Sequence, residues 1–134
     1  QGEEARLMTE TTVVDLGAVQ MVTVPGELYP ELGLAGPHGT TYYQDPQDPA
    51  ADFQGVACAP PIQANMRDTP YKLVLGLAND EVGYIIPKCQ WDRAPPYTYG
   101  DDEATYGEGL SPGPEMAPTL NAIVAEELGA LATD

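Results

Sequence analysis

The stretch of sequence that most restricts the fold is residues 33–70, which is rich in glycine, proline, aspartate and glutamine. It contains GPHGT and QDPQDPAAD, and its apolar residues keep neither the period of two of a strand nor the period of 3.6 of a helix. We therefore predict a long irregular excursion here. Excursions of this length are uncommon in compact domains unless they bind something or are tied down.

Two cysteines could link this irregular stretch covalently to the rest of the chain, because Cys58 lies near its end and Cys89 lies downstream of it. A disulfide between them would close a loop of roughly 30 residues, worth about 3 kcal/mol through chain entropy. The spacing is equally compatible with two free thiols, so the sequence leaves both states open. A disulfide would indicate an extracellular or periplasmic location. Neither cysteine belongs to a CxxC or CxxCH motif of the kind that binds zinc or attaches haem.

Regular structure is predicted on both sides of the excursion. Residues 11–15 and 19–24 are β-branched runs separated by Leu16-Gly17-Ala18, a pattern typical of a hairpin. The run YKLVLGLA at 71–78 predicts a central buried strand. The sequence therefore indicates a mixed sheet of short strands within a single domain that spans residues 1–134.

The final segment, residues 114–131, is predicted to be an amphipathic helix that follows Gly/Pro-rich loops. The fold class we expect is α/β, with a mixed sheet of short strands and a C-terminal helix. The apolar residues expected to share one face of this helix are Met116, Leu120, Ile123, Val124, Leu128 and Leu131.

The charge of the chain narrows its possible partners. A net charge of −16, from 21 acidic and five basic residues, predicts that the surface repels nucleic acid and anionic lipid. No apolar run approaches the roughly 20 residues needed for a transmembrane segment, so we expect a soluble chain. Because the first residue is Gln1 rather than methionine, we expect that a signal peptide or a longer polypeptide precedes it.

Two residues stand where strands end, the position at which active sites of open α/β sheets gather. Glu27 follows the run that stops at Pro25-Gly26, and Tyr84 follows the strand predicted at 71–78. A carboxylate and a phenolate are hard oxygen ligands for a cation. The simpler interpretations are a surface turn carboxylate and a core aromatic. Among the other candidates, His38 lacks a partner at metal-ligand spacing and is most simply a solvated loop residue.

Three segments carry a resemblance to a known family: VDLGAVQMVTVPGELYPEL, YKLVLGLANDEVGYIIPKCQWD and YGEGLSPGPEMAPTL. They resemble the later part of the catalytic domain of the neutral/alkaline ceramidase superfamily, and more narrowly its bacterial ceramidase-like proteins. The resemblance covers most of residues 13–130 outside the excursion. It implies that the chain is the C-terminal portion of a zinc amidohydrolase that cleaves a linear amide, with lipid amides as one such substrate.

In that family two histidines, a glutamate and a tyrosine hold a zinc ion, and a serine lies near the metal. The resemblance implies that Glu27, after the Pro-Gly pair, and Tyr84, after the GLAN segment, are zinc ligands. The histidines and the serine belong to earlier parts of the domain, and His38 falls in the divergent excursion. Zinc would therefore need ligands from a missing N-terminal part or from another polypeptide. The sequence leaves open whether this chain alone is an enzyme.

Two other interpretations remain open. The chain is alternatively a non-catalytic extracellular structural module that self-associates, keeping the fold without the chemistry. Its acidic surface, long Gly/Pro-rich loop, eight tyrosines and open strand edges favour this interpretation. Calcium binding by residues 101–103 or by DPQDPAAD is a third interpretation, although neither has the spacing of a calcium-binding loop and a solvated acidic loop is simpler.

Overall fold

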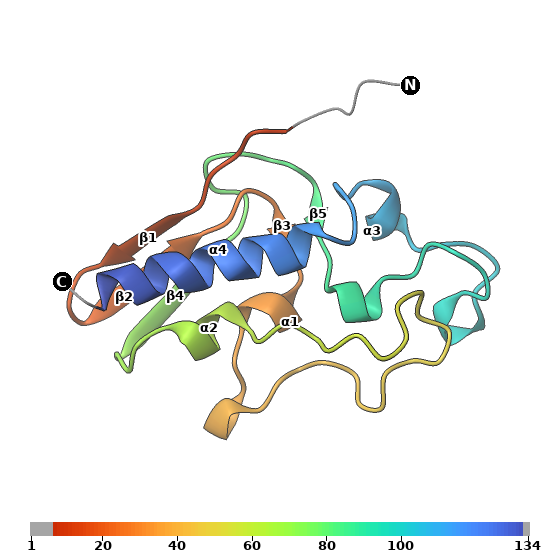
Figure 1. Cartoon of the computed structure of the whole chain (residues 1–134), viewed down its shortest axis with the longest axis horizontal. Coiled ribbons are helices and arrows are strands. Elements are labelled where there is room, and N and C mark those ends of the chain that lie inside the picture. Colours follow the sequence, from red (N-terminus) through yellow and green to blue (C-terminus); the bar gives the residue numbers. More distant parts are fainter. Residues whose placement is uncertain (1–6, 133–134) are drawn as a thin grey trace.

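The chain has a mixed α/β fold, as predicted, in a computed structural model that describes residues 7–132 apart from the side chain of Tyr99. Figure 1 shows strands and one long helix packed in one half of the molecule, with loops and short turns in the other. The strands are β1 (Thr12–Asp15), β2 (Val19–Thr23), β3 (Glu27–Leu28), β4 (Tyr71–Leu75) and β5 (Tyr84–Ile85). The helices are α1 (Pro30–Gly33), α2 (Ile62–Asn65), α3 (Tyr106–Gly109) and α4 (Met116–Leu131), and 3₁₀ turns cover Pro37–Gly39, Lys88–Gln90 and Thr98–Gly100.

The predicted N-terminal hairpin is confirmed. β1 pairs with β2 in antiparallel fashion, with Val13 opposite Val22. Gly17 supplies the positive φ of 78° that the connecting turn requires. The Asp15 carboxylate accepts a hydrogen bond from the Gly17 amide at 2.8 Å and a two-nitrogen contact from the Arg67 guanidinium, with Nη2 at 2.7 Å. These contacts fasten the turn to the segment that precedes β4.

The strand predicted at 71–78 exists but does not lie at the centre of a sheet. β4 covers Tyr71–Leu75 and pairs in parallel with β2, giving the order β1-β2-β4 among the described strands. The burial of β4 alternates, so that Tyr71, Leu73 and Leu75 are exposed on one face. The prediction of a central strand was wrong because a continuous apolar run was taken to mean burial on both faces.

One face of the three-stranded sheet is covered by α4, which packs against β1 and α2. The inward side chains Val22 and Val24 join Leu120, Val124 and Leu128 in the core. The predicted helix is therefore confirmed, although it begins at Met116 rather than at residue 114. Two of the six residues assigned to its buried face, Ile123 and Leu131, are exposed by 45% and 39%.

The stretch predicted as an irregular excursion is mostly irregular, but it is fixed to the rest of the molecule at several points. The disulfide between Cys58 and Cys89, which the sequence left open, is formed, with the Cα atoms 5.1 Å apart. Ile62 in α2 enters the hydrophobic core. The Gln63 amide donates to the Lys72 carbonyl at 3.0 Å, which occupies one acceptor of β4. The excursion is thus part of the folded structure.

Candidate functional site

Glu27 and Tyr84 are brought together by a second, two-stranded sheet. β3 and β5 pair in parallel, and Glu27 and Tyr84 are partners in their register. The backbone continues this pairing at both ends, because the Glu27 amide donates to the Gly83 carbonyl at 3.0 Å and the Tyr29 amide donates to the Ile85 carbonyl at 3.1 Å. Glu27 and Tyr84, which lie far apart in the sequence, therefore occupy adjacent positions where β3 and β5 begin.

Close backbone packing around two glycines makes this pairing possible. A Cβ atom at Gly26 would lie 2.4 Å from the Gly83 carbonyl oxygen. A Cβ atom at Gly83 would lie 1.9 Å from the Leu110 carbonyl oxygen, and Gly83 also has a φ of +91°. Side chains at these two positions would push β3, β5 and the segment before α4 apart. The Pro25-Gly26 pair therefore ends β2 and turns the chain tightly into β3.

The side chains of Glu27 and Tyr84 interact with each other electrostatically. Glu27 is exposed, whereas Tyr84 is half-buried and its ring meets Tyr29 and Tyr106 edge to face, with centroids 6.3 Å and 5.8 Å away. Burial raises the pKa of Tyr84, and the negative charge of Glu27 and its hydrogen bond with the phenol raise it further. The neutral phenol therefore acts as a donor to the carboxylate. Without a cation, these two groups form a hydrogen-bonded pair.

His38 does not lie beside this pair, whereas the charge of Glu81 acts on Tyr84. His38 is exposed on the turn Pro37–Gly39, which lies far from β3 and β5 in Figure 1. The described residues contain no group of three or more histidine, cysteine, aspartate or glutamate side chains placed to hold a metal ion. Glu27 and Tyr84 could thus supply at most two ligands of a four-coordinate zinc site.

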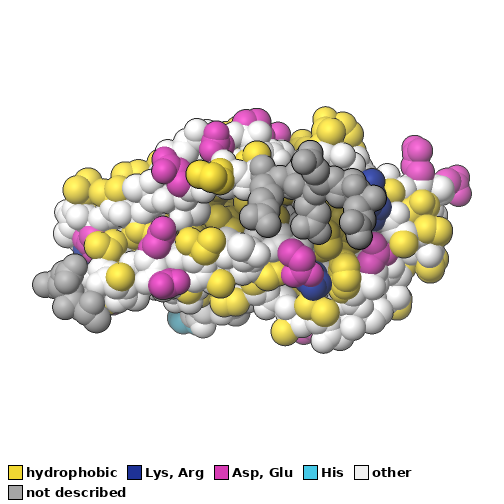
Figure 2. Space-filling view, turned by 45° about the horizontal axis from the view of Figure 1, so that its top comes forward, with side chains coloured by type: hydrophobic (Ala, Val, Ile, Leu, Met, Phe, Trp, Pro, Cys, Tyr) yellow, Lys and Arg dark blue, Asp and Glu magenta, His cyan; other side chains and the backbone are white. Residues whose placement is uncertain are grey.

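The acidic segments considered for calcium have other roles or are exposed. Asp48 and Asp52 accept hydrogen bonds from backbone amides, Asp48 from Ala50 at 2.8 Å and Asp52 from Arg93 at 2.8 Å. Asp101–Glu103 is exposed. Figure 2 shows acidic side chains scattered among apolar and uncharged ones on the face in view. Asp48 and Asp52 therefore serve in backbone contacts, Asp101–Glu103 faces solvent, and calcium binding by either segment stays a prediction.

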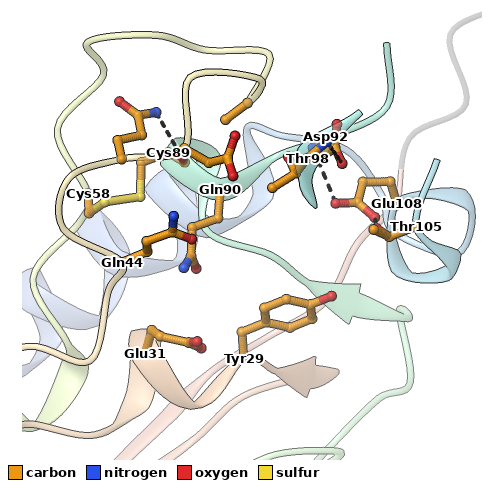
Figure 3. A pocket seen from close by; sticks show the side chains of 13 residues that line it. Tyr29, Glu31, Gln44, Cys58, Cys89, Gln90, Asp92, Thr98, Thr105 and Glu108 are labelled. Atoms are coloured by element: carbon orange, nitrogen blue, oxygen red, sulfur yellow. Dashed lines mark hydrogen bonds between the residues drawn. A yellow bond between two sulfur atoms is a disulfide. The ribbon is translucent and has the colours of Figure 1, made fainter. Parts of the chain in front are cut away.

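Sequence reasoning missed a pocket that adjoins the Glu27–Tyr84 pair through the ring of Tyr29. The pocket has a volume of about 240 Å³. Figure 3 shows its walls converging from several segments, with the disulfide on one side and Glu108 on the other. The residues that line it are Tyr29, Glu31, Gln44, Gln47, Asp48, Ala51, Cys58, Cys89, Gln90, Asp92, Thr98, Thr105 and Glu108.

Two buried carboxylates form the inner part of this pocket. Asp92 and Glu108 are each only 2% exposed. Asp92 Oδ2 accepts a hydrogen bond from the Thr98 amide at 2.9 Å, and Glu108 Oε1 accepts one from the Asp92 amide at 3.3 Å. The Thr105 hydroxyl donates to Glu108 Oε2. Burial raises the pKa of Glu108, and the nearby charge of Asp92 adds to this rise.

The sequence signal for this pocket is weak, because residues 92–109 have a polar, aromatic and Gly/Pro-rich composition that is typical of any loop. Within the part of the chain that the structure describes, no helix has the length and apolar character needed to cross a membrane. Comparisons with family models, curated proteins and solved structures found no match to this chain.

Proposed function

We propose that the chain is the C-terminal portion of a ceramidase-like zinc amidohydrolase that cleaves a linear amide, with lipid amides among its substrates. One observation carries this proposal: Glu27 and Tyr84, the two residues that the resemblance implies as ligands, are direct partners in the register of β3 and β5. Side chains at paired positions on one face of neighbouring strands lie within reach of one cation. Glu27 and Tyr84, which were chosen from the sequence alone, are therefore neighbours in the fold.

The chemistry of the pair fits a divalent cation. Burial and then the neighbouring carboxylate raise the pKa of the Tyr84 phenol, and both favour its neutral form. A divalent cation held by Glu27 and Tyr84 would act in the opposite direction, since it would favour the phenolate. Zinc, when bound, would supply Lewis acidity for amide hydrolysis. Glu27 and Tyr84 would orient it, and the packing of Gly26 against Gly83 would keep the two ligands at a fixed separation.

The remaining parts of the site would come from outside this chain. The family's two histidines and its serine would be contributed by a preceding segment of the same domain or by another polypeptide. The exposed side chains on the outer face of β4 offer a surface that such a partner would cover, with Leu73 and Leu75 each 42% exposed. The disulfide supports an extracellular or periplasmic location for the assembly.

Zinc analysis of the complete assembly tests this proposal. Removing the carboxylate with Glu27→Ala should lower the affinity for zinc by at least about 100-fold, because even loss of an outer-shell partner commonly costs 10–100-fold. Tyr84→Phe should weaken binding as well. Glu126→Ala, which removes an exposed carboxylate from α4, is the matched control and should leave the metal content unchanged. Unchanged zinc stoichiometry in Glu27→Ala would contradict the proposal.

A self-associating extracellular module is a second candidate function, favoured by the apolar row on β4. Tyr71, Leu73 and Leu75 are exposed along a strand at the edge of the described sheet, which is the arrangement that invites pairing with another copy. Sedimentation velocity over a wide concentration range should then show association that Leu73→Lys abolishes. Ile123→Lys, at a similarly exposed position on α4, is the control. A strictly monomeric profile of the unmodified chain would count against this function.

A further inference from the structure

The pocket beside Tyr29 collects hydrogen-bonding atoms that have no partner among the described residues. Four buried side-chain atoms are in this state: Glu31 Oε2, Gln90 Oε1, Asp92 Oδ1 and Thr98 Oγ1. All four residues line the same pocket. A buried polar atom without a partner costs about 1–3 kcal/mol, so a cluster of four in one cavity indicates a site built to receive a ligand.

The side chains that present these atoms are held firmly in place. Asp92 is 2% exposed and Thr98 is 7% exposed. The hydrogen bond from the Thr98 amide to Asp92 Oδ2 fixes the carboxylate and leaves Oδ1 for another donor. Glu108 accepts hydrogen bonds from the Asp92 amide and from the Thr105 hydroxyl, which fixes the neighbouring backbone. The inner wall is therefore ordered before any ligand arrives.

A partner for these atoms has to donate hydrogen bonds, and the acidic lining favours one that carries positive charge. Three of the unpartnered atoms are carboxylate or amide oxygens, which only accept. The carboxylates of Glu31, Asp48, Asp92 and Glu108 line the pocket, and the described lining includes no lysine or arginine. Burial is the main cause of the raised pKa of Glu108, and a cation inside the pocket would offset the smaller contribution from the charge of Asp92.

The shape of the pocket favours an organic cation over a metal ion. Its carboxylates do not form a group of three placed around one point, so they suit donors spread along a molecule. Its volume of about 240 Å³ is several times the roughly 30 Å³ occupied by one water molecule. Ala51, the disulfide and the Tyr29 ring supply apolar wall between the polar atoms, against which an alkyl chain can pack.

We propose that this pocket binds a small aliphatic ammonium compound, such as a diamine. Its ammonium N–H groups would donate to Asp92 Oδ1 and Glu31 Oε2, and its methylene groups would lie against the disulfide and the Tyr29 ring. Glu27 and Tyr84 do not line the pocket, so this proposal does not depend on the zinc site.

Calorimetric titration of the 134-residue chain with 1,4-diaminobutane at constant ionic strength tests the proposal. We expect a saturable isotherm with one site per chain. Glu31→Gln should weaken binding at least about tenfold, because a hydrogen bond to a charged group contributes about 1.5–3 kcal/mol. Asp92→Asn should weaken it similarly. Since Asp92 is buried, circular dichroism would check that this variant folds, and the less buried Glu31 keeps the test decisive if it does not.

Glu126→Gln is the matched control, because it removes one exposed charge from a chain whose net charge is −16. It should leave the affinity unchanged. Equal weakening in Glu31→Gln and Glu126→Gln would overturn the proposal by showing general attraction to an acidic surface. Binding of neutral 1,4-butanediol as tight as that of the diamine, or displacement of the diamine by equimolar calcium, would overturn it as well.

Discussion

The two halves of the molecule are stabilised in different ways. The sheet–helix half, formed by β1, β2, β4, α2 and α4, buries a continuous apolar core in which Val22 and Val124 are fully buried. The loop half, formed by residues 41–61 and 87–110, has only short helical turns and is fixed by a disulfide and by side chains that bond to backbone groups. Figure 1 shows the two halves side by side.

The two halves also differ in which buried polar side chains they contain. The buried polar side chains of the sheet–helix half, such as Gln20 and Asn121, are uncharged, whereas the loop half contains the buried carboxylates of Asp92 and Glu108 and the pocket beside them. β3 and β5, which carry Glu27 and Tyr84, lie where the halves meet. Apolar packing therefore supplies a rigid platform, and the polar groups that could act on a ligand lie on or next to the loops.

The largest expected effect comes from removing the disulfide. The double substitution Cys58→Ala/Cys89→Ala opens a loop with a sequence separation of 31, which should lower the free energy of unfolding by about 3–4 kcal/mol in urea denaturation. Hydrogen exchange should show lost protection in the loop half and retained protection in α4. Equal loss of protection in both halves would show that they unfold as one unit. It would contradict the statement that the halves are stabilised in different ways.

Shortening a core side chain should destabilise the sheet–helix half. Leu120 on α4 is 4% exposed and lies in the apolar cluster, so Leu120→Ala should lower the free energy of unfolding by about 3 kcal/mol. Ile123→Ala on the same helix is the control and should cost less than about 0.5 kcal/mol, because this side chain is 45% exposed. Comparable losses from the two variants in thermal or urea unfolding would contradict the assigned core face.

A smaller effect is expected from a polar contact in the loop half. The Asp52 carboxylate accepts hydrogen bonds from the amides of Arg93 and Ala94, joining the two loop segments. Asp52→Ala should therefore cost about 1–2 kcal/mol of unfolding free energy, measured by urea denaturation. Asp101→Ala, which removes an exposed carboxylate from the same half, should have little effect. If both variants were equally stable, side-chain hydrogen bonds could not be what fixes this half.

The smallest effect is a difference in pH dependence between the halves. Arg67 holds the pKa of Asp15 far below its usual value of 3.8, so the stability that Asp15 contributes is present above that value and declines as the pH falls below it. Burial shifts the pKa of Glu108 upward from 4.5, so its contribution is present at low pH and is lost as the pH rises through the folded-state value.

The slope of unfolding free energy against pH, measured from roughly pH 2 to pH 7, should reveal both signs. Asp15→Asn should flatten the fall in stability below about pH 4. Glu108→Gln should instead raise stability at neutral pH relative to acidic pH. Slopes that change in the same direction in the two variants would refute the opposite environments of these carboxylates.

The sheet–helix half was largely predictable from sequence, and the loop half was not. The β-branched runs at 11–15 and 19–24 and the helical spacing of Leu120, Val124 and Leu128 reflect burial on one face, which leaves a periodic pattern. The exposed face of β4 and the exposed Ile123 were misjudged because apolar residues also occur on surfaces, where periodicity alone does not exclude them.

The candidate sites were accessible to sequence reasoning to different degrees. Chemistry alone placed Glu27 and Tyr84 at strand ends, and the family resemblance paired them as ligands; the structure adds their register. The pocket has no comparable signal, because Glu31 in α1 lies far along the chain from Asp92 and Glu108. Their convergence depends on the disulfide and on side-chain hydrogen bonds to the backbone, which leave no period in the sequence.

The contact between Gly26 and Gly83 bears on how sequences of this kind could diverge. If the proposed zinc site exists, a relative without it could replace Glu27 or Tyr84 at little cost to folding, yet any side chain at Gly26 or Gly83 would collide with a neighbouring backbone oxygen. In a saturation mutagenesis screen for folding, the glycines should be intolerant and their ligand neighbours permissive. In a screen for the proposed zinc binding, all four positions should be intolerant. Substitutions at Gly26 and Gly83 would thus report on the backbone fold, and substitutions at Glu27 and Tyr84 would report on the proposed metal site.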